Sequence, residues 1–337
     1  MRRLLLIIAA LTLAACGPTT PGTPSTSPQL DAALLDRDIA VLADRAQPAT
    51  IEVAVQNIEG GEVWAWNGDK AFPMQSVFKA PLGAAVLSQV DLGKLSLDEV
   101  VTLEEKDISP AHSKIADAWP ARTDYTVREL LTWAVGDSDN TAADVLMKRI
   151  GGPGALTAWM RGRRIADIRV DRYERELQTE ANGMASFRIA WKGWPAFSAA
   201  RNTLPEALRR EATLRYLADP RDRATAVGAL TFLRKLSNGE LLKPKSTAML
   251  LTLMSTANTG PRRMTDGLPD GATWAHKTGT SATDLGVTPV VNDIGILTLK
   301  DGRRYAITVF MTGTTLDEAA QEALFVDIMR VIVKAAG

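Results

Sequence analysis

The chain has little of the chemistry on which several classes of protein depend. It contains one cysteine, Cys16, so no disulfide bond can form within it. Its two histidines, His112 and His276, lie far apart, whereas zinc hydrolases usually recruit several histidine, cysteine or carboxylate ligands, although carboxylates alone could still bind a hard cation. Basic and acidic residues number 39 each, so no broad basic surface for nucleic acid is implied. We therefore expect no metal ion, no cofactor and no nucleic-acid partner.

The first 15 residues have the composition of an export signal. A basic start is followed by the apolar run 4–13, which is too short to span a bilayer comfortably as a permanent helix. Leu13-Ala14-Ala15-Cys16 resembles the lipobox of bacterial lipoproteins, which implies cleavage before Cys16 and a lipid on its thiol. We expect a signal peptide at 1–15 and a lipid-anchored periplasmic protein. The alternative is a plain signal peptide with an incidental cysteine.

Residue 17 bears on which membrane holds the lipid. Gly17 stands where an aspartate often marks retention in the inner membrane, which favours the outer membrane in a Gram-negative source. Residues 18–28 are rich in Pro, Thr, Ser and Gly, a composition that cannot bury a core. We therefore expect a flexible linker at 16–29 and a folded body at 30–337.

Apolar periodicity predicts strands near both ends of the body and helices between them. Strands are expected over 51–55, 63–66, 274–280, 293–299 and 305–312, and helices over 30–46, 78–90, 126–135, 141–150, 224–237, 245–254 and 317–334. Gly60-Gly61 indicates a hairpin between the first two strands, and Thr126 with Glu129 has the capping-box pattern of a helix start. This order favours an antiparallel sheet built from both ends of the chain, with a helical lobe inserted and a cleft between them.

Three short motifs carry residues suited to nucleophilic catalysis. In Ser76-Val77-Phe78-Lys79 the hydroxyl and the ammonium share one face of a helix, and a serine hydroxyl needs a neighbour to take its proton. Ser138-Asp139-Asn140 lies between two predicted helices, and Lys277-Thr278-Gly279-Thr280 lies on a predicted strand. Taken singly, each pattern also fits a structural role: a solvated lysine, a helix cap and a charged edge strand.

Together and in this order, the three motifs resemble those of class A serine β-lactamases and penicillin-binding proteins. The resemblance covers the folded body and implies the α/β (α+β) β-lactamase/DD-peptidase fold, with a five-stranded antiparallel sheet flanked by helices and an all-helical lobe. It divides the chain into an α/β lobe at 30–74 and 255–337 and a helical lobe at 75–254. It implies β-lactam substrates and Ser76 as the nucleophile.

The same resemblance implies roles for the other motif residues. Lys79 would help to deprotonate Ser76, Ser138 would pass a proton to the lactam nitrogen, and Lys277 would hold Ser138 and the substrate carboxylate. The implied substrate-binding residues are Asn140, Thr278, Gly279, Thr280 and Arg263, with the backbone N–H groups of Ser76 and Thr280 as the oxyanion hole. Arg263 is an expected partner for the substrate carboxylate, and the alternative is a solvated arginine beside Arg262.

A fourth segment separates β-lactamases from penicillin-binding proteins. Residues 172–178 read R-Y-E-R-E-L-Q and resemble the class A loop R-W-E-P-E-L-N, whose first glutamate activates the deacylating water. Glu174 is the implied base, with Glu180 as a competitor and Glu211 as a weaker one. In the family the loop closes through an ion pair, which we expect here between Arg172 and Asp222.

The loop carries an insertion. Gln178 and Asp222 are 44 positions apart (222 − 178) where the family has about nine, so roughly thirty-five residues are added, at about 179–218. The insertion contains Phe187, Trp191, Trp194, Phe197 and a helix-like stretch at 205–217, which predict either a flap beside the cleft or a passive extension over the helical lobe. Ile108-Ser109-Pro110 stands where many relatives place an aromatic side chain at the cleft rim, so a stacking wall is either missing or supplied by the insertion.

Rival functions share part of this pattern. A DD-peptidase or penicillin-binding protein would keep the three motifs without needing Glu174 or the Arg172–Asp222 loop. A β-lactam sensor would acylate and stay acylated, and a structural lipoprotein would need no motif. We expect a monomeric β-lactamase that confers β-lactam resistance.

Overall fold

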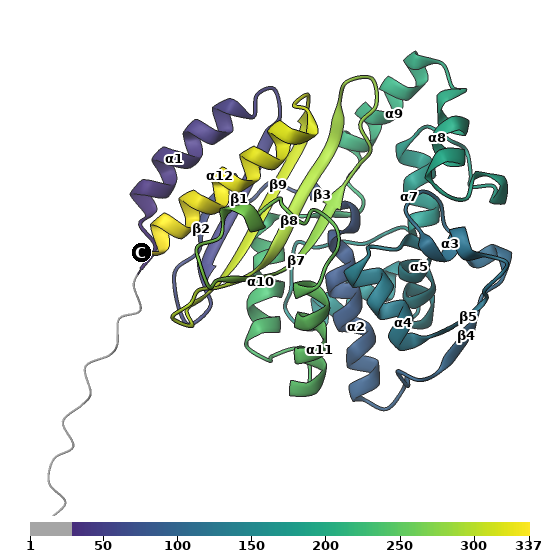
Figure 1. The fold of residues 1–337 in the computed structure, drawn as a ribbon, viewed down its shortest axis with the longest axis horizontal. Helices are drawn as coiled ribbons and strands as arrows, with labels where there is room; N and C mark the ends of the chain where they lie inside the picture. Colours follow the sequence, from purple (N-terminus) through teal and green to yellow (C-terminus); the bar gives the residue numbers. More distant parts are fainter. Residues whose placement is uncertain (1–28) are drawn as a thin grey trace, which may run out of the picture.

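The computed structural model describes residues 29–337, and a five-stranded sheet lies at its centre (Figure 1). The strands are antiparallel, in the order β2-β1-β9-β8-β7. Their bounds are Thr50–Asn57 (β1), Trp64–Trp66 (β2), Thr273–Thr280 (β7), Thr288–Thr298 (β8) and Arg304–Thr314 (β9). The expected five-stranded antiparallel sheet and the hairpin of β1 with β2 are confirmed. The predicted export signal, Cys16 and nearly all of the linker lie outside the described residues.

One face of the sheet packs against α1 (Ala32–Arg45) and α12 (Glu318–Ala336) (Figure 1). Strand alternation determines which side chains face these helices. On β9 the side chains of Tyr305, Ile307, Val309 and Met311 join the core beneath α1 and α12. Ala306 and Phe310 point to the opposite face and join the larger core. No described helix is both long and apolar enough to cross a membrane.

The other face of the sheet packs against the helical lobe. Helices α10 (Ala226–Ser237) and α11 (Pro244–Ser255) contact its strands, and α2 (Lys79–Asp91) packs against α11. Helix α2 is buried on nearly every side from Lys79 to Ser88, so it lies inside the lobe and is apolar all round. Gly83 allows close packing there, because a Cβ at this position would lie 3.0 Å from both Val135 and Leu250. A rigid, enclosed helix therefore carries the S-x-x-K lysine at its first residue.

The remaining elements complete the helical lobe. They are α3 (Lys114–Ala118), α4 (Val127–Leu131), α5 (Asn140–Arg149), α6 (Pro153–Gly162) and two strand pairs, β3 (Phe72–Pro73) with β6 (Arg223–Ala224) and β4 (Val100–Thr102) with β5 (Asp124–Thr126). The capping box of Thr126 and Glu129 forms as expected. Helix α6 was not expected, although Gly152 at φ +92° and Pro153 at the first turn mark its start.

Three helices occupy the segment between Arg172 and Asp222: α7 (Glu174–Ala181), α8 (Trp194–Asn202) and α9 (Glu206–Ala218). Figure 1 shows α8 and α9 beyond the end of the sheet, on the side of α7. The helix expected at 205–217 corresponds to α9. Helix α8 was not expected, and the loop expected at 172–178 turns into a helix at Glu174.

Strand β8 is longer than expected and begins at Thr288, five residues before the predicted start. Pro289, which lacks a backbone N–H, hides this extension from periodicity. The strand tolerates the proline because the regular register with β9 omits it: Thr288 pairs with Thr314 and Val290 with Thr312, which leaves Gly313, at φ +70°, opposite Pro289. The extension lengthens the wall of the cleft beyond the K-T-G motif.

Candidate active site

The candidate nucleophile lies in a tight turn at the start of α2. Ser76 belongs to the 3₁₀ turn Gln75–Phe78, and Lys79 follows as the first residue of the helix. This spacing lets Lys79 Nζ donate a hydrogen bond of 2.9 Å to Ser76 Oγ. Gln75 adopts φ +47°, a conformation that is costly for a residue with a side chain and that often marks functional sites.

Strands β7 and β8 hold this turn in place. The Asn292 amide on β8 donates to the carbonyl oxygens of Pro73 (2.9 Å) and Met74 (3.1 Å). Gly279 of the K-T-G motif packs so closely that a Cβ would collide with the Met74 carbonyl oxygen. The glycine is therefore required for β7 to lie against the turn that carries Ser76.

Lys79 is the centre of a buried polar cluster. Its ammonium is fully buried and donates to the Ser138 carbonyl oxygen (2.7 Å) and to Asn140 Oδ1 (2.6 Å). It also forms an ion pair of 3.0 Å with Glu174, which is equally buried. Ser138 reaches this position at φ +60°. The cluster thus brings the first two motifs and the expected base into contact.

Lys277 completes the cluster from β7. Its ammonium donates to Ser138 Oγ at 3.0 Å, and Lys79 Nζ lies 3.4 Å from the same oxygen. Burial, reinforced by the positive charge of Lys79, holds the pKa of Lys277 well below its usual value. The Ser138 hydroxyl therefore lies between two ammonium groups and can relay a proton.

Helix α7 presents Glu174 to the nucleophile. Asp144 on α5 accepts the backbone N–H groups of Glu174 (2.7 Å) and Arg175 (2.9 Å), which caps α7 at its start. Burial raises the pKa of Asp144 to about 7. Glu174 Oε1 then lies 3.4 Å from Ser76 Oγ, a distance that allows contact directly or through one water.

Gln178 connects the candidate base with the nucleophile's neighbour. Its Nε2 donates to Glu174 Oε2 (2.8 Å) and to Gln75 Oε1 (3.0 Å). The Gln75 amide in turn donates to the hydroxyl of Tyr216 on α9 (2.7 Å). A chain of side-chain hydrogen bonds therefore joins Glu174 to the insertion.

The expected ion pair closes the segment. Arg172 Nε lies 2.6 Å from Asp222 Oδ2, and both side chains are buried. Glu180 contacts Arg172 (2.6 Å) and Arg221 (2.8 Å), and neither it nor Glu211 lines the cleft. Of the three candidate bases, the structure brings only Glu174 to Ser76.

Arg263 lies behind β7 and is buried, so the alternative of a solvated arginine is wrong. Its guanidinium donates to Thr280 Oγ1 (2.9 Å) and to Glu322 (3.1 Å). Thr278 and Thr280 line the cleft, and Arg263 does not. Its positive charge therefore reaches the cleft through the hydroxyl of Thr280.

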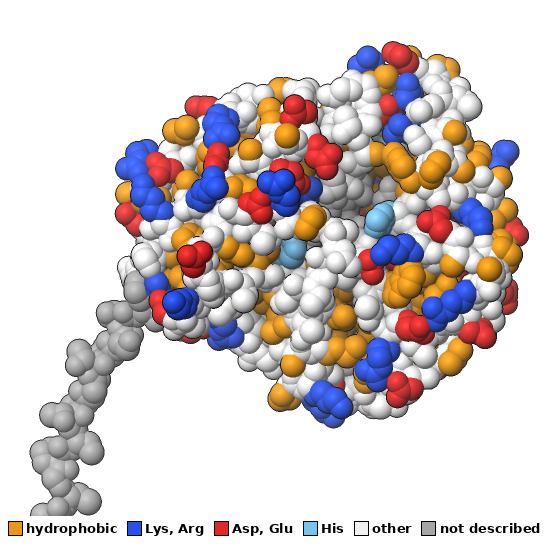
Figure 2. Space-filling view, in the orientation of Figure 1, with side chains coloured by type: hydrophobic (Ala, Val, Ile, Leu, Met, Phe, Trp, Pro, Cys, Tyr) orange, Lys and Arg blue, Asp and Glu red, His pale blue; other side chains and the backbone are white. Residues whose placement is uncertain are grey.

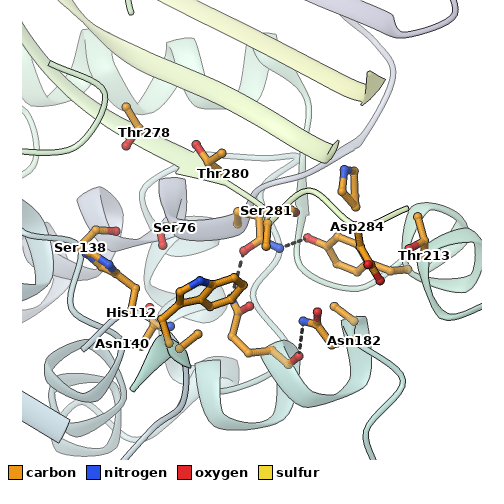
Figure 3. Close-up of a pocket in the computed structure, with 18 of the residues that line it drawn as sticks. Ser76, His112, Ser138, Asn140, Asn182, Thr213, Thr278, Thr280, Ser281 and Asp284 are labelled. Carbon is orange, nitrogen blue, oxygen red and sulfur yellow. Dashed lines mark hydrogen bonds between the residues drawn. The ribbon is translucent and has the colours of Figure 1, made fainter. Parts of the chain in front are cut away.

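A cleft of about 580 Å³ lies above Ser76, and Figure 2 shows the hollow in the surface. Ser76, Ser138 and Asn140 lie on one side of it, and Thr213 and Asp284 lie toward the other (Figure 3). The insertion therefore flanks the cleft. It supplies Trp194, Arg209, Thr213 and Tyr216 to the lining, and Trp194 provides an aromatic ring that Ile108–Pro110 lack.

Sequence reasoning assigned no role to Asp144, Asn292 or Tyr216. Asp144 follows Asn140 by one helical turn, so an acidic residue on the buried face of that helix was a usable signal. Asn292 and Tyr216 lie outside the three motifs and the 172–178 segment. Among residues 29–337, no group of three or more His, Cys, Asp or Glu side chains is arranged to hold a metal ion.

Comparisons with known proteins agree with this geometry. Residues 34–336 match the model of the β-lactamase enzyme family. The chain is 31% identical to the extended-spectrum β-lactamase PER-1 of Pseudomonas aeruginosa, over 83% of this chain and 80% of the relative. It is 28% identical to β-lactamase VEB-1 of the same organism, over 85% of each chain. A β-lactamase structure from Chitinophaga pinensis matches with a TM-score of 0.75 and 32% identity, over 90% of this chain and 99% of that one. An ancestral class A β-lactamase structure matches with a TM-score of 0.72 and 32% identity, over 89% of this chain and 99% of that one. The chain belongs to the class A serine β-lactamases.

Proposed function

We propose that this β-lactamase opens the lactam ring through an acyl-enzyme on Ser76 and that Glu174 activates the water that releases it. One observation carries the proposal: Ser76 Oγ lies within reach of both Lys79 Nζ (2.9 Å) and Glu174 Oε1 (3.4 Å) inside a fully buried charge cluster. Burial strengthens such interactions because water does not screen them.

Acylation begins when Ser76 Oγ attacks the lactam carbonyl carbon. Its proton passes to the Lys79–Glu174 pair, and the backbone N–H groups of Ser76 and Thr280 stabilise the oxyanion, each worth about 3 kcal/mol. The carbon–nitrogen bond of the ring then breaks. Ser138 gives its proton to the leaving nitrogen, with the adjacent ammonium of Lys277 favouring that transfer. Lys79, whose Nζ lies 3.4 Å from Ser138 Oγ, returns a proton to Ser138, so the proton of Ser76 leaves the pair and Glu174 is again a carboxylate.

Deacylation adds one water to the ester. Glu174 takes a proton from the water, the hydroxide attacks the ester carbonyl, and the proton returns to Ser76 Oγ as the carboxylate product leaves. Gln178 orients the carboxylate of Glu174 by its hydrogen bond to Oε2. The longer side chain thus takes the place of the family's asparagine.

Substrate orientation uses the cations and hydroxyls of the cleft. Lys277 and the hydroxyls of Thr278 and Thr280 bind the carboxylate on the ring fused to the lactam, and Arg263 supports them from behind. Asn140 spends one amide hydrogen on the carbonyl of Pro110 and has a second for the acylamide of the substrate.

Mass spectrometry of the folded body mixed with benzylpenicillin, followed from seconds to an hour, tests the proposal. Wild type should consume the penicillin without a lasting adduct. Glu174→Ala should accumulate an adduct with the mass of the intact penicillin on Ser76, because the ester forms and no base activates water. Glu211→Ala, which removes an exposed carboxylate on α9, serves as the matched control and should turn over like wild type.

Each rival has its own outcome. A wild type that stays acylated would identify a sensor or penicillin-binding protein and would contradict the role of Glu174. A Glu174→Ala variant that still turns over rapidly would move the base to another residue.

We further propose that the protein is monomeric and is held at the periplasmic face of a membrane, with the outer membrane favoured, by a lipid on Cys16. The lipobox-like sequence before Cys16 supports the anchor. Membrane fractionation of cells expressing wild type and Cys16→Ser tests it, since only the variant should be released in soluble form. Sedimentation of the folded body tests the monomer.

A further inference from the structure

The insertion builds the end of the cleft opposite Ser138 of the second motif. Trp194 comes from α8, and Arg209, Thr213 and Tyr216 come from α9. In Figure 3 Thr213 and Asp284 lie on the side of the cleft opposite Ser138. Asp284 belongs to the loop between β7 and β8, so the insertion meets the sheet here and closes this end of the cleft.

Two arginines share one carboxylate at this junction. Arg209 Nη1 lies 2.6 Å from Asp284 Oδ1, and Arg201 Nη2 lies 3.8 Å from the same oxygen. Asn202 Oδ1 accepts hydrogen bonds from Arg201 (3.1 and 3.2 Å) and from Arg209 (3.2 Å). The group therefore carries two positive charges against one negative charge.

The positive charge is buried and incompletely bonded. The side chains of Arg201 and Arg209 are 7% and 12% exposed. Arg201 Nη1 and Arg209 Nε are buried and have no acceptor within the described part of the chain. Buried donors of a charged group are costly to leave unpaired, so such donors beside a cleft call for an acceptor with negative charge.

A purely structural contact between α9 and the β7–β8 loop would need only one of the two arginines. The short ion pair of Arg209 with Asp284 is enough to hold α9 against the β7–β8 loop. Arg201 adds a second cation that has no carboxylate of its own, and this excess lowers stability unless an anion offsets it. The ion pair that holds α9 against the loop therefore does not account for the charge of Arg201.

Trp194 stands beside this cluster as an apolar surface. Its side chain is 44% exposed and lines the cleft. Phe197 (ring centroids 6.4 Å apart) and the guanidinium of Arg201 (5.8 Å from the ring) hold the indole in position. A ring leaving Asn140 toward the insertion would meet Trp194 and could then reach Arg209.

We propose that the cluster of Arg201, Arg209 and Asp284 is a subsite for a negatively charged acyl side chain of the β-lactam, with Trp194 packing on the body of that side chain. This inference rests on the proposed acyl-enzyme reaction and names the substrate class that it favours. A carboxylate on the side chain would contact Arg209, which lines the cleft, and its charge would offset the excess positive charge that Arg201 adds from behind.

A matched pair of substrates tests the subsite. Benzylpenicillin and α-carboxybenzylpenicillin differ only by a carboxylate on the acyl side chain. Arg209→Gln should lower the ratio of kcat/KM for the carboxylated penicillin to that for benzylpenicillin by about tenfold, the scale of one hydrogen bond between charged groups. Arg210→Gln removes the neighbouring, exposed arginine on α9 and should leave the ratio unchanged.

Asp284→Asn changes the net charge of the cluster in the opposite direction, toward positive. It removes the competing carboxylate, so the ratio should rise about tenfold. This variant decides the matter even where Arg209→Gln does not fold, since an unchanged or lower ratio overturns the subsite. If neither substitution changes the ratio and wild type hydrolyses benzylpenicillin, the subsite alone is refuted. If wild type stays acylated, the proposed function is refuted.

Discussion

The two ends of the cleft each hold a cluster of two basic side chains and one carboxylate, and the two clusters differ in how completely they are hydrogen-bonded. At the end with Ser76, Lys79 and Lys277 lie with the carboxylate of Glu174. At the end with the insertion, Arg201 and Arg209 lie with the carboxylate of Asp284. Each cluster holds two cations and one anion.

Hydrogen bonding separates the two clusters. Lys79 finds an acceptor in each direction, namely Ser76 Oγ, the Ser138 carbonyl, Asn140 Oδ1 and Glu174. The arginine cluster leaves two donors without an acceptor in residues 29–337. A complete network fixes its atoms before substrate arrives, which suits a chemical step common to all substrates. An incomplete one is finished by part of the ligand, which suits discrimination between substrates.

The largest effect should follow from opening the complete cluster. Lys79→Met should lower kcat/KM for benzylpenicillin by about a thousandfold, the scale of a lost proton-transfer group. The loss should appear in the acylation rate, measured by stopped-flow burst kinetics, because Ser76 loses the partner that holds its proton. Circular dichroism checks that the variant is folded. A folded variant with less than a tenfold loss would mean that Lys79 only fills space.

A smaller effect on kcat/KM should follow from exchanging Lys277 for arginine. The pKa of Lys277 is held well below its usual value, so raising the pH removes its proton early, and kcat/KM should fall along an alkaline limb. Lys277→Arg keeps the charge at high pH, so the limb should move upward, at the cost of about a tenfold lower kcat/KM near neutrality because the guanidinium has a different shape. Profiles of kcat/KM between pH 6 and 10.5 measure both. If the alkaline limbs of wild type and Lys277→Arg coincide, the group that titrates is not Lys277.

The complete cluster was largely predictable from the sequence, and the incomplete one was not. Ser76 and Lys79 are one helical turn apart and the other two motifs are each continuous, so each motif is visible in a short stretch, and the three together resemble those of class A β-lactamases. The sheet was predictable for a similar reason, because alternation along β9 already separates its two faces. Local patterns determine both features.

Long-range packing determines the rest. Several glutamates lie in or near the 172–178 segment. The capping of α7 by Asp144 places Glu174, and not Glu180, beside Ser76. The arginine cluster depends on α8, which was not predicted, and on a loop residue 75 positions beyond Arg209. No local spacing encodes such a contact.

The smallest effect should come from the link between the two ends. The hydroxyl of Tyr216 on α9 accepts the buried amide of Gln75, which contacts Gln178 and through it Glu174. Tyr216→Phe keeps the ring and removes that acceptor, so it should cost about 1 kcal/mol of unfolding free energy. It should also slow deacylation about threefold while leaving acylation unchanged, because only the orientation of Glu174 is loosened.

Thermal unfolding and pre-steady-state kinetics with benzylpenicillin measure the two effects of Tyr216→Phe. A loss of a hundredfold or more would make the insertion part of the chemical step and would erase the distinction between the two ends of the cleft. A slower acylation with unchanged deacylation would place the influence of Tyr216 on the Ser76 turn through Gln75, since that residue precedes the nucleophile and holds a strained backbone. The expected result, a mild loss confined to deacylation, keeps the reaction at one end and recognition at the other.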